Sequence, residues 1–292
     1  RSRGHGSEDH ALMEIQGHRG ARGLRPESTL QSFETALDLG VDTLELDCHL
    51  TADDQVLVWH DEALWDEKVR GVGERAREFP VAIRSLHSDD LHQYVADKNP
   101  DPDRFPLQRP DATPLAGDTY HLSTLAELFS FVAMYASEDF GKSTDLRANA
   151  ATVGFNVETK RVEAHPDYIG DGFDGEHVGT FEVAIIDAMD SAGVTDRCTI
   201  QSFDFRSLRA INHFRSDIRL SALTEFVPDF GDLLAFGASI WSPYYELLSA
   251  ENVAQAHQAG LRVLPWTVNE TVDMHRISDM GVDGFITDRP DL

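Results

Sequence analysis

Residues 17–64, GHRGARGLRPESTLQSFETALDLGVDTLELDCHLTADDQVLVWHDEAL, decide the fold of this chain. The stretch contains five side chains that can carry acid–base, anion-binding or cation-binding chemistry: His18, Arg19, Glu45, Asp47 and His60. Short apolar runs that alternate with turn-prone residues separate these side chains in the sequence. We expect the fold to bring all five to one place.

The segment Thr43–Leu50, TLELDCHL, has the alternation of a strand that is buried on one face. Glu45, Asp47 and His49 share one face of this strand, and the apolar side chains between them share the other. Two buried ionised carboxylates on one face would repel each other. A bound cation is the simplest remedy, and oxygen ligands of this type suit Mg or Ca.

A hairpin is predicted next, because the turn-prone centre Ala52-Asp53-Asp54 separates two strand-like runs. Folding about that centre returns residue 60 to a place opposite residue 47. His60 would then lie beside Asp47, and the Asp61 carboxylate could orient its imidazole.

Upstream, a short strand at residues 14–17 ends in His18-Arg19-Gly20. Pro26-Glu27-Ser28 follows and leads into an amphipathic helix that runs to Leu39, with Ser28 as the expected N-cap. The histidine and the arginine of this glycine-containing strand end are candidates for acid–base and anion-binding roles.

Strands and helices alternate through the rest of the chain. We expect main strands near residues 16, 45, 155, 200, 220, 240, 264 and 285, a helix at 122–135 capped by Ser123, and a loop at 138–150. Alternation of this kind predicts parallel strands joined by helices. Eight such units in 292 residues fit an α/β fold of the closed (β/α)8 type, which needs about 250 residues. The alternative is a doubly wound open sheet. The sequence has no glycine-rich nucleotide-binding loop at its first turn to support that fold.

Residues 61–120 break this rhythm with six prolines and many charges. We interpret them as an insertion of about 60 residues within a single domain that spans 14–292, although 88–97 is compatible with a helix. Residues 1–13 are polar and have no apolar core of a signal peptide, so a flexible tail is expected there.

The strand predicted at 152–160 places Asn156, Glu158 and Lys160 on one face. Polar side chains that face inward at a strand end are typical of the C-terminal rim of a barrel, where active sites lie. Glu158 can therefore join Glu45 and Asp47. On spacing alone, the three carboxylates are either ligands of one divalent cation or salt-bridged rim residues.

Several of these segments together resemble the signature of the glycerophosphodiester phosphodiesterase family. They are His18-Arg19-Gly20, Pro26-Glu27-Ser28-Thr29, Glu45-Leu46-Asp47, Thr51-Ala52-Asp53 and His60-Asp61. Later stretches also resemble the family: Glu158-Thr159-Lys160, Gln201-Ser202-Phe203, Trp266-Thr267-Val268-Asn269 and residues 283–290. One departure is Ser28, which stands where the family more often has Asn.

The resemblance implies a (β/α)8 TIM barrel whose insertion after the His60-Asp61 pair caps its mouth. It implies that His18 and His60 act as catalytic acid and base, that Arg19 and Lys160 bind phosphate, and that Gln201, Phe203 and Trp266 line the substrate pocket. Glu45, Asp47 and Glu158 would bind one divalent cation, Mg or Ca. The implied reaction is hydrolysis of glycerophosphodiesters to sn-glycerol 3-phosphate and an alcohol.

The composition of the chain limits the classes of molecule that it is expected to bind. The chain has 25 basic and 51 acidic residues, a net charge of −26, which argues against nucleic-acid binding. No apolar run approaches the roughly 20 residues of a membrane-spanning helix. Its two cysteines, Cys48 and Cys198, are expected to be buried apolar residues. We therefore expect a small-molecule substrate, with oligomeric state and compartment, cytoplasm or periplasm, left open.

Two alternatives to glycerophosphodiester hydrolysis remain at this level. One is a related phosphodiesterase that acts on lysophospholipids or another phosphodiester. The other is a barrel that binds its ligand without catalysis, against which the complete set of seven motif residues argues: His18, Arg19, Glu45, Asp47, His60, Glu158 and Lys160.

Overall fold

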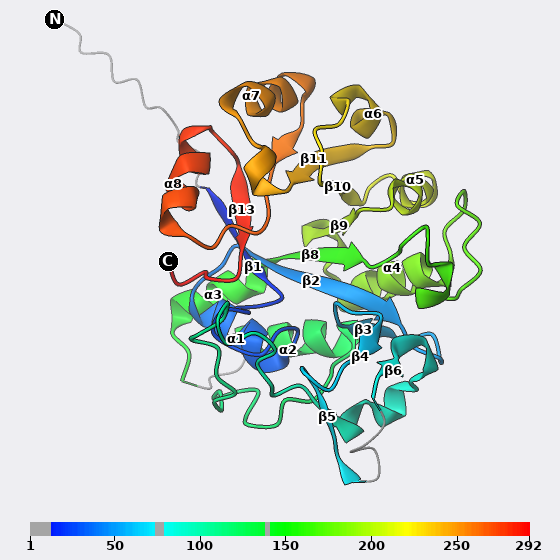
Figure 1. Cartoon of the computed structure of the whole chain (residues 1–292), viewed down its shortest axis with the longest axis vertical. Coiled ribbons are helices and arrows are strands. Elements are labelled where there is room, and N and C mark those ends of the chain that lie inside the picture. Colours follow the sequence, from blue (N-terminus) through cyan, green and yellow to red (C-terminus); the bar gives the residue numbers. More distant parts are fainter. Residues whose placement is uncertain (1–12, 74–78, 138–140) are drawn as a thin grey trace, which may run out of the picture.

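Eight parallel strands form the centre of the molecule in a computed structural model that describes residues 13–73, 79–137 and 141–292 (Figure 1). The tail expected at 1–13 lies outside these residues except for Met13. The strands are β1 (Glu14–His18), β2 (Thr43–Leu50), β8 (Gly154–Thr159), β9 (Cys198–Ser202), β10 (Arg219–Thr224), β11 (Ala238–Pro243), β12 (Arg262–Val263) and β13 (Gly284–Thr287). Their order in the sheet is β12-β11-β10-β9-β8-β2-β1-β13.

The two ends of this sheet meet through backbone hydrogen bonds. The amide of Asp283 donates to the carbonyl of Val263 at 3.0 Å, and the amide of Ile286 donates to that of Pro265 at 2.9 Å. The sheet is therefore a nearly closed barrel, and the predicted (β/α)8 fold is confirmed. The strand expected near residue 264 is β12, which is only two residues long because the chain leaves regular pairing after Val263.

Helices surround the barrel in Figure 1 and cover the outer face of its strands. They are α1 (Leu30–Asp38), α2 (Leu125–Ser137), α3 (Thr144–Thr152), α4 (Thr180–Ala192), α5 (Phe205–Phe214), α6 (Phe230–Ala235), α7 (Ala250–Ala259) and α8 (Thr271–Asp279). The alternation predicted for β2 is observed: Leu44, Leu46 and Cys48 belong to the apolar core, and Glu45 and Asp47 contact polar groups of the site. Within the described ranges, no helix is both long and apolar enough to cross a membrane.

Three local predictions were wrong. The N-cap of α1 is Thr29, whose side chain accepts from the amide of Ser32, whereas Ser28 has a left-handed backbone with a φ of 58°. Helix α3 begins inside the segment predicted as loop and runs two residues past its end at 150, because Ser143 caps it and its sequence is rich in alanine. At α2, Thr124 rather than Ser123 exchanges capping hydrogen bonds with Glu127.

The segment between β3 (Val56–Val58) and α2 has its own small pairings and its own core. Strand β4 (Ala63–Leu64) pairs with β6 (Val81–Ala82), and β5 (Arg70–Gly71) pairs with β7 (Tyr94–Val95). A second apolar cluster there includes Trp59, Leu64, Val69, Ile83 and Tyr94. The piece compatible with a helix is a 3-10 turn, Ser88–Gln93, followed by β7. The boundaries 61 and 120 of a capping insertion stay a prediction.

A buried ion-pair network fixes the chain where it leaves β8. The Arg161 guanidinium binds Asp171 at 2.8 and 3.0 Å, and it binds Glu182 of α4 at 2.7 and 2.8 Å. Glu182 also accepts from the Ser207 hydroxyl of α5 at 2.7 Å. This network ties the end of β8, which carries Glu158 and Lys160, to two helices.

We predict that Glu182→Ala lowers the free energy of unfolding by about 3–5 kcal/mol, because it removes the carboxylate that the buried Arg161 and Ser207 side chains donate to. Urea unfolding followed by circular dichroism measures the change. Asp217→Ala, which removes an exposed partner of Arg215, is the control and should change stability far less. Equal losses in the two variants would contradict a structural role for the network.

Candidate active site

The predicted site residues meet in one cavity at the C-terminal ends of the strands. Its volume is about 330 Å³, and nine of the ten predicted residues line it: His18, Arg19, Glu45, His60, Glu158, Lys160, Gln201, Phe203 and Trp266. The tenth, Asp47, is buried beside them and lies 3.0 Å from Arg19. The barrel therefore brings together residues that are up to 248 positions apart, from 18 to 266.

Three buried carboxylates form the centre of the site. Asp47 of β2 and Glu158 of β8 are direct neighbours across the parallel pair, and the nearest oxygens of Glu45, Asp47 and Glu158 all lie within 4.8 Å of one another. Glu45 accepts from the Gln201 side chain at 2.8 Å and from the amide of Arg19 at 3.0 Å. Glu158 accepts from Lys160 at 2.9 Å.

Asp47 is the least satisfied member of this triad. Both of its oxygens are buried without a hydrogen-bond donor, since the nearby Arg19 Nε–H does not point at them. Buried carboxylate oxygens without donors are costly unless a cation binds them. The donor set of three carboxylates is that of a hard divalent ion, so the residues present fit a bound Mg or Ca.

Repulsion within the triad appears in its protonation. Burial and the charge of Asp47 raise the pKa of Glu45 well above its usual range. Burial raises the pKa of Glu158 to about 7, with Lys160 opposing the rise. Burial also acts to raise the pKa of Asp47, but Arg19, His60 and Lys160 outweigh it and hold that pKa well below the usual value.

His18, at the end of β1, is oriented by Asp288, which follows β13. Its Nδ1 lies 2.7 Å from Asp288 Oδ1, and Asp288 also accepts from Arg22 at 2.7 and 2.9 Å. Because an ionised carboxylate only accepts, Nδ1 donates and Nε2 faces Glu45 at 3.8 Å. Burial lowers the pKa of His18 to about 4, so at neutral pH its Nε2 lone pair is free to take a proton.

His60 is oriented by Asp61, as predicted, with Nδ1 at 2.7 Å from Asp61 Oδ1. Strand β3 returns beside β2 as expected, although it is Trp59 rather than His60 that pairs with Asp47. Burial lowers the pKa of His60, and Asp61 opposes that effect. About 31% of its side chain remains exposed, more than for His18.

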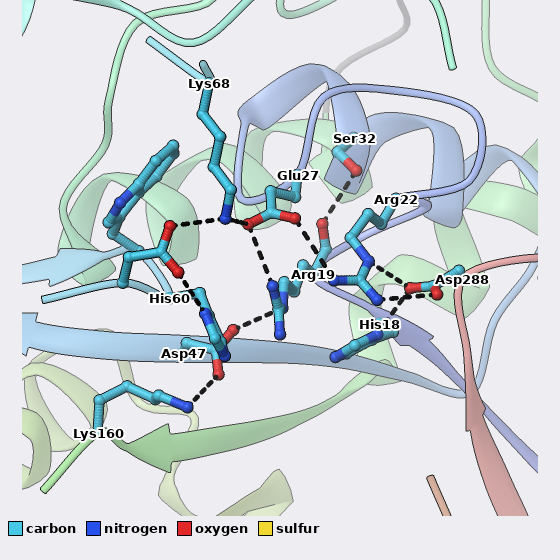
Figure 2. Close-up of polar contacts among 12 residues, drawn as sticks. His18, Arg19, Arg22, Glu27, Ser32, Asp47, His60, Lys68, Lys160 and Asp288 are labelled. Carbon is cyan, nitrogen blue, oxygen red and sulfur yellow. Dashed lines mark hydrogen bonds and ion pairs between the residues drawn. The ribbon is translucent and has the colours of Figure 1, made fainter. Parts of the chain in front are cut away.

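A chain of ion pairs connects the two histidines (Figure 2). It runs from Asp61 to Lys68 at 2.6 Å, from Lys68 to Glu27 at 2.9 Å, from Glu27 to Arg22 at 3.5 Å, and from Arg22 to Asp288 at 2.7 Å. Glu27 also binds Arg19 at 3.1 Å. In Figure 2, His18 and His60 lie on either side of Arg19. The network fixes both imidazoles relative to one guanidinium.

The family model described as the glycerophosphoryl diester phosphodiesterase family matches residues 18–292. The chain belongs to this family. A glycerophosphodiester phosphodiesterase from Bacillus subtilis is 27% identical to it, over 94% of this chain and 83% of the relative. A mouse lysophospholipase D is 24% identical over 94% of this chain and 82% of the relative.

Solved structures agree with this placement. A protein from Silicibacter pomeroyi, assigned as a glycerophosphoryl diester phosphodiesterase, superposes with a TM-score of 0.78 at 27% identity and covers 99% of this chain and 93% of its own. An Oleispira antarctica phosphodiesterase in complex with sn-glycerol-3-phosphate superposes with a TM-score of 0.70 at 18% identity. It covers 95% of this chain and 93% of its own, and it supports the fold.

One wall of the active-site cavity is apolar. Phe203 and Trp266 meet edge to face at 5.4 Å between ring centroids, and Leu223 and Ile286 line the cavity beside them. Gln201 does more than line the cavity, because its amide donates to Glu45 and accepts from Asn156 at 3.0 Å. It therefore orients a triad carboxylate.

Sequence reasoning gave no role to Arg22, Glu27, Lys68 and Asp288. Glu27 and Asp288 lie inside the quoted family motifs, so motif membership could have indicated them. Arg22 and Lys68 carried no such signal. Their roles come from contacts with residues far away in the chain.

We predict that divalent-cation binding weakens as pH falls below about 7, because a proton on Glu158 must leave before its carboxylate binds a cation. The raised pKa of Glu45 acts in the same direction. Calorimetric titration with Mg or Ca at pH 6 and 8, in buffers of different ionisation enthalpy, measures affinity and proton release. Equal affinity at both pH values without proton release would contradict this linkage.

Proposed function

We propose that this family member, a glycerophosphodiester phosphodiesterase, uses a divalent cation and two histidines to hydrolyse glycerophosphodiesters to sn-glycerol 3-phosphate and an alcohol. The observation that carries this proposal is the cavity itself. Three buried carboxylates, two oriented imidazoles and several cations surround a space of about 330 Å³. The cations can bind the anionic phosphodiester, and an imidazole can donate a proton to the alcohol that leaves it.

Glu45, Asp47 and Glu158 would hold the cation, either Mg or Ca. When bound, such an ion polarises phosphoryl oxygens and stabilises the charge that develops on them. Arg19 and Lys160 add positive charge beside the triad in a chain whose net charge is −26. The guanidinium fork of Arg19 suits phosphate oxygens. Phe203 and Trp266 would pack against the carbon skeleton of the substrate.

The two histidines differ in a way that suits separate roles. His18 is the more buried and is neutral at physiological pH, so we assign it as the base that takes a proton from the attacking hydroxyl. His60 is more exposed, and Asp61 opposes the lowering of its pKa by burial, so we assign it as the acid that protonates the leaving alcohol. The attacking hydroxyl is that of water or of the substrate glycerol.

Residues 61–120 contribute Lys68 and Arg104 to the cavity. This supports their proposed role as a cap over the barrel mouth within a single domain that spans 14–292. In that position the segment would shape the space for the leaving alcohol.

A second candidate function is hydrolysis of lysophospholipids. A cavity of about 510 Å³ adjoins the first at Phe203 and is lined by Val162, Phe205 and the exposed Phe226. These side chains could bind an acyl chain. Choline release from lysophosphatidylcholine, compared with release from glycerophosphocholine, separates the two functions.

We predict that His18→Ala and His60→Ala each lower kcat by at least ~10²-fold, because each removes a proton-transfer group. Release of glycerol 3-phosphate from glycerophosphocholine measures turnover. His213→Ala, at an exposed histidine of α5, is the matched control and should retain activity. Near wild-type turnover in both site variants would overturn the acid–base assignment.

We also predict that EDTA abolishes this activity and that Mg or Ca restores it, because the triad needs a cation to offset its repulsion. The same assay, with each ion added back after dialysis, identifies the usable metal. Full activity after thorough chelation would contradict the metal site while leaving the family assignment in place.

A further inference from the structure

Arg104 lines the same cavity from segment 61–120, on a hydrogen-bonded turn. The amide of Phe105 donates to the carbonyl of Asp101 at 2.8 Å, and the amide of Arg104 donates to the Asp101 carboxylate at 3.1 Å. The Asn99 side chain closes the turn by donating to the carbonyl of Phe105 at 2.8 Å. The backbone that carries Arg104 is therefore held in place.

The side chain of Arg104 is anchored by an aromatic ring that it shares with Arg22. The buried Phe105 ring lies 4.8 Å from the Arg22 guanidinium and 5.0 Å from that of Arg104. Arg22 is itself bound to Asp288, which orients His18. One contact chain thus joins Arg104 to the histidine site.

The other cations of this cavity already have carboxylate partners. Arg19 and Lys68 bind Glu27, Arg22 binds Asp288, and Lys160 binds Glu158. Within residues 13–73, 79–137 and 141–292, no carboxylate lies within 4.0 Å of the Arg104 guanidinium. Among the cavity-lining cations in these residues, Arg104 is thus the one without a carboxylate partner.

Arg104 lines the cavity together with Trp266 of the apolar wall. Burial raises the pKa of Tyr244, which follows β11, and the charge of Arg104 opposes that rise. The Tyr244 ring packs 5.5 Å from Trp266 of the cavity wall. Arg104 therefore lines the same cavity as the aromatic ring against which Tyr244 packs.

We propose that Arg104 selects glycerophosphodiesters whose leaving alcohol carries an anionic group, such as a second phosphate. The inference rests on the proposed hydrolysis. The phosphate that is cleaved belongs at the triad, with Arg19 and Lys160. Because the glycerol part of the substrate is uncharged, an anion that reaches Arg104 must be on the alcohol. The guanidinium fork suits phosphate or carboxylate oxygens.

Two substrates that differ by one charged group test this proposal. Glycerophosphoglycerol releases glycerol, a neutral alcohol, whereas bis(glycerophospho)glycerol releases glycerophosphoglycerol, an alcohol that still carries one anionic phosphodiester. We expect the wild-type protein to favour the second in kcat/KM, and Arg104→Gln to lower the ratio of the two kcat/KM values by roughly 10-fold. Added salt should shrink the wild-type ratio, since the contact is exposed to solvent.

Charge reversal gives an independent readout. Arg104→Glu should raise kcat/KM for glycerophosphocholine, whose leaving alcohol is the cation choline, relative to that for bis(glycerophospho)glycerol. Arg109→Gln, at an exposed arginine of the same segment that does not line the cavity, should leave the ratios as in wild type.

An unchanged ratio in Arg104→Gln and in Arg104→Glu would overturn the proposal while leaving hydrolysis itself intact. Failure of the wild-type protein to cleave any of the three substrates would instead refute the proposed function. The two failures are therefore distinguishable in one set of assays.

Discussion

Repulsion among three buried carboxylates is the constraint on which the rest of the site depends. Ligand oxygens of Glu45, Asp47 and Glu158 lie within 4.8 Å of one another, and all three side chains are buried. The surrounding residues offset this repulsion only in part. Gln201 and Lys160 each donate to one carboxylate, while the Asp47 oxygens keep no hydrogen-bond donor. Because neighbouring donors offset only part of the repulsion among the three carboxylates, a bound cation would stabilise the site.

The loop after β1 serves this centre through backbone geometry. Arg19 has a φ of 52°, which directs its amide to Glu45 while its side chain reaches Glu27 and Asp47. Gly20 has a φ of 86°, and a Cβ there would lie 2.5 Å from the backbone of Ser32 in α1. Only glycine allows the turn to pack so closely on the helix. The motif His18-Arg19-Gly20 therefore reflects a packing requirement as well as chemistry.

Charge is distributed unevenly in this molecule. The chain as a whole carries −26, yet its cavity is lined by Arg19, Arg22, Lys68, Arg104 and Lys160. Pairing with Glu27, Asp61 and Asp288 makes most of these cations structural supports of the two histidines. An anionic substrate thus meets local positive charge in a protein whose overall field would repel it. Segment 61–120 supplies two of the five cations, and so takes part in the electrostatics of the site.

The sequence by itself determined the architecture and most of the site. Alternation in residues 43–50 separated Glu45 and Asp47 from the core-facing leucines, because the period of a strand fixes which side chains share a face. Motif spacing brought in His18, His60, Glu158 and Lys160. Local rules were less reliable at Ser28 and at 144–152, where a backbone turn against Arg19 and a capped alanine-rich helix decided the outcome.

Only the tertiary structure revealed the partner that orients His18 and the ion pairs that connect it to His60. Asp288 lies 270 residues from His18, and Lys68 reaches Glu27 across 41 residues. No local period or capping rule links such pairs, because barrel closure and the packing of segment 61–120 bring them together. The same holds for Arg104, because its surroundings in space decide that no described carboxylate pairs with it. The sequence specified which groups are present, and the closed barrel decided which of them are neutralised and which remain free to act.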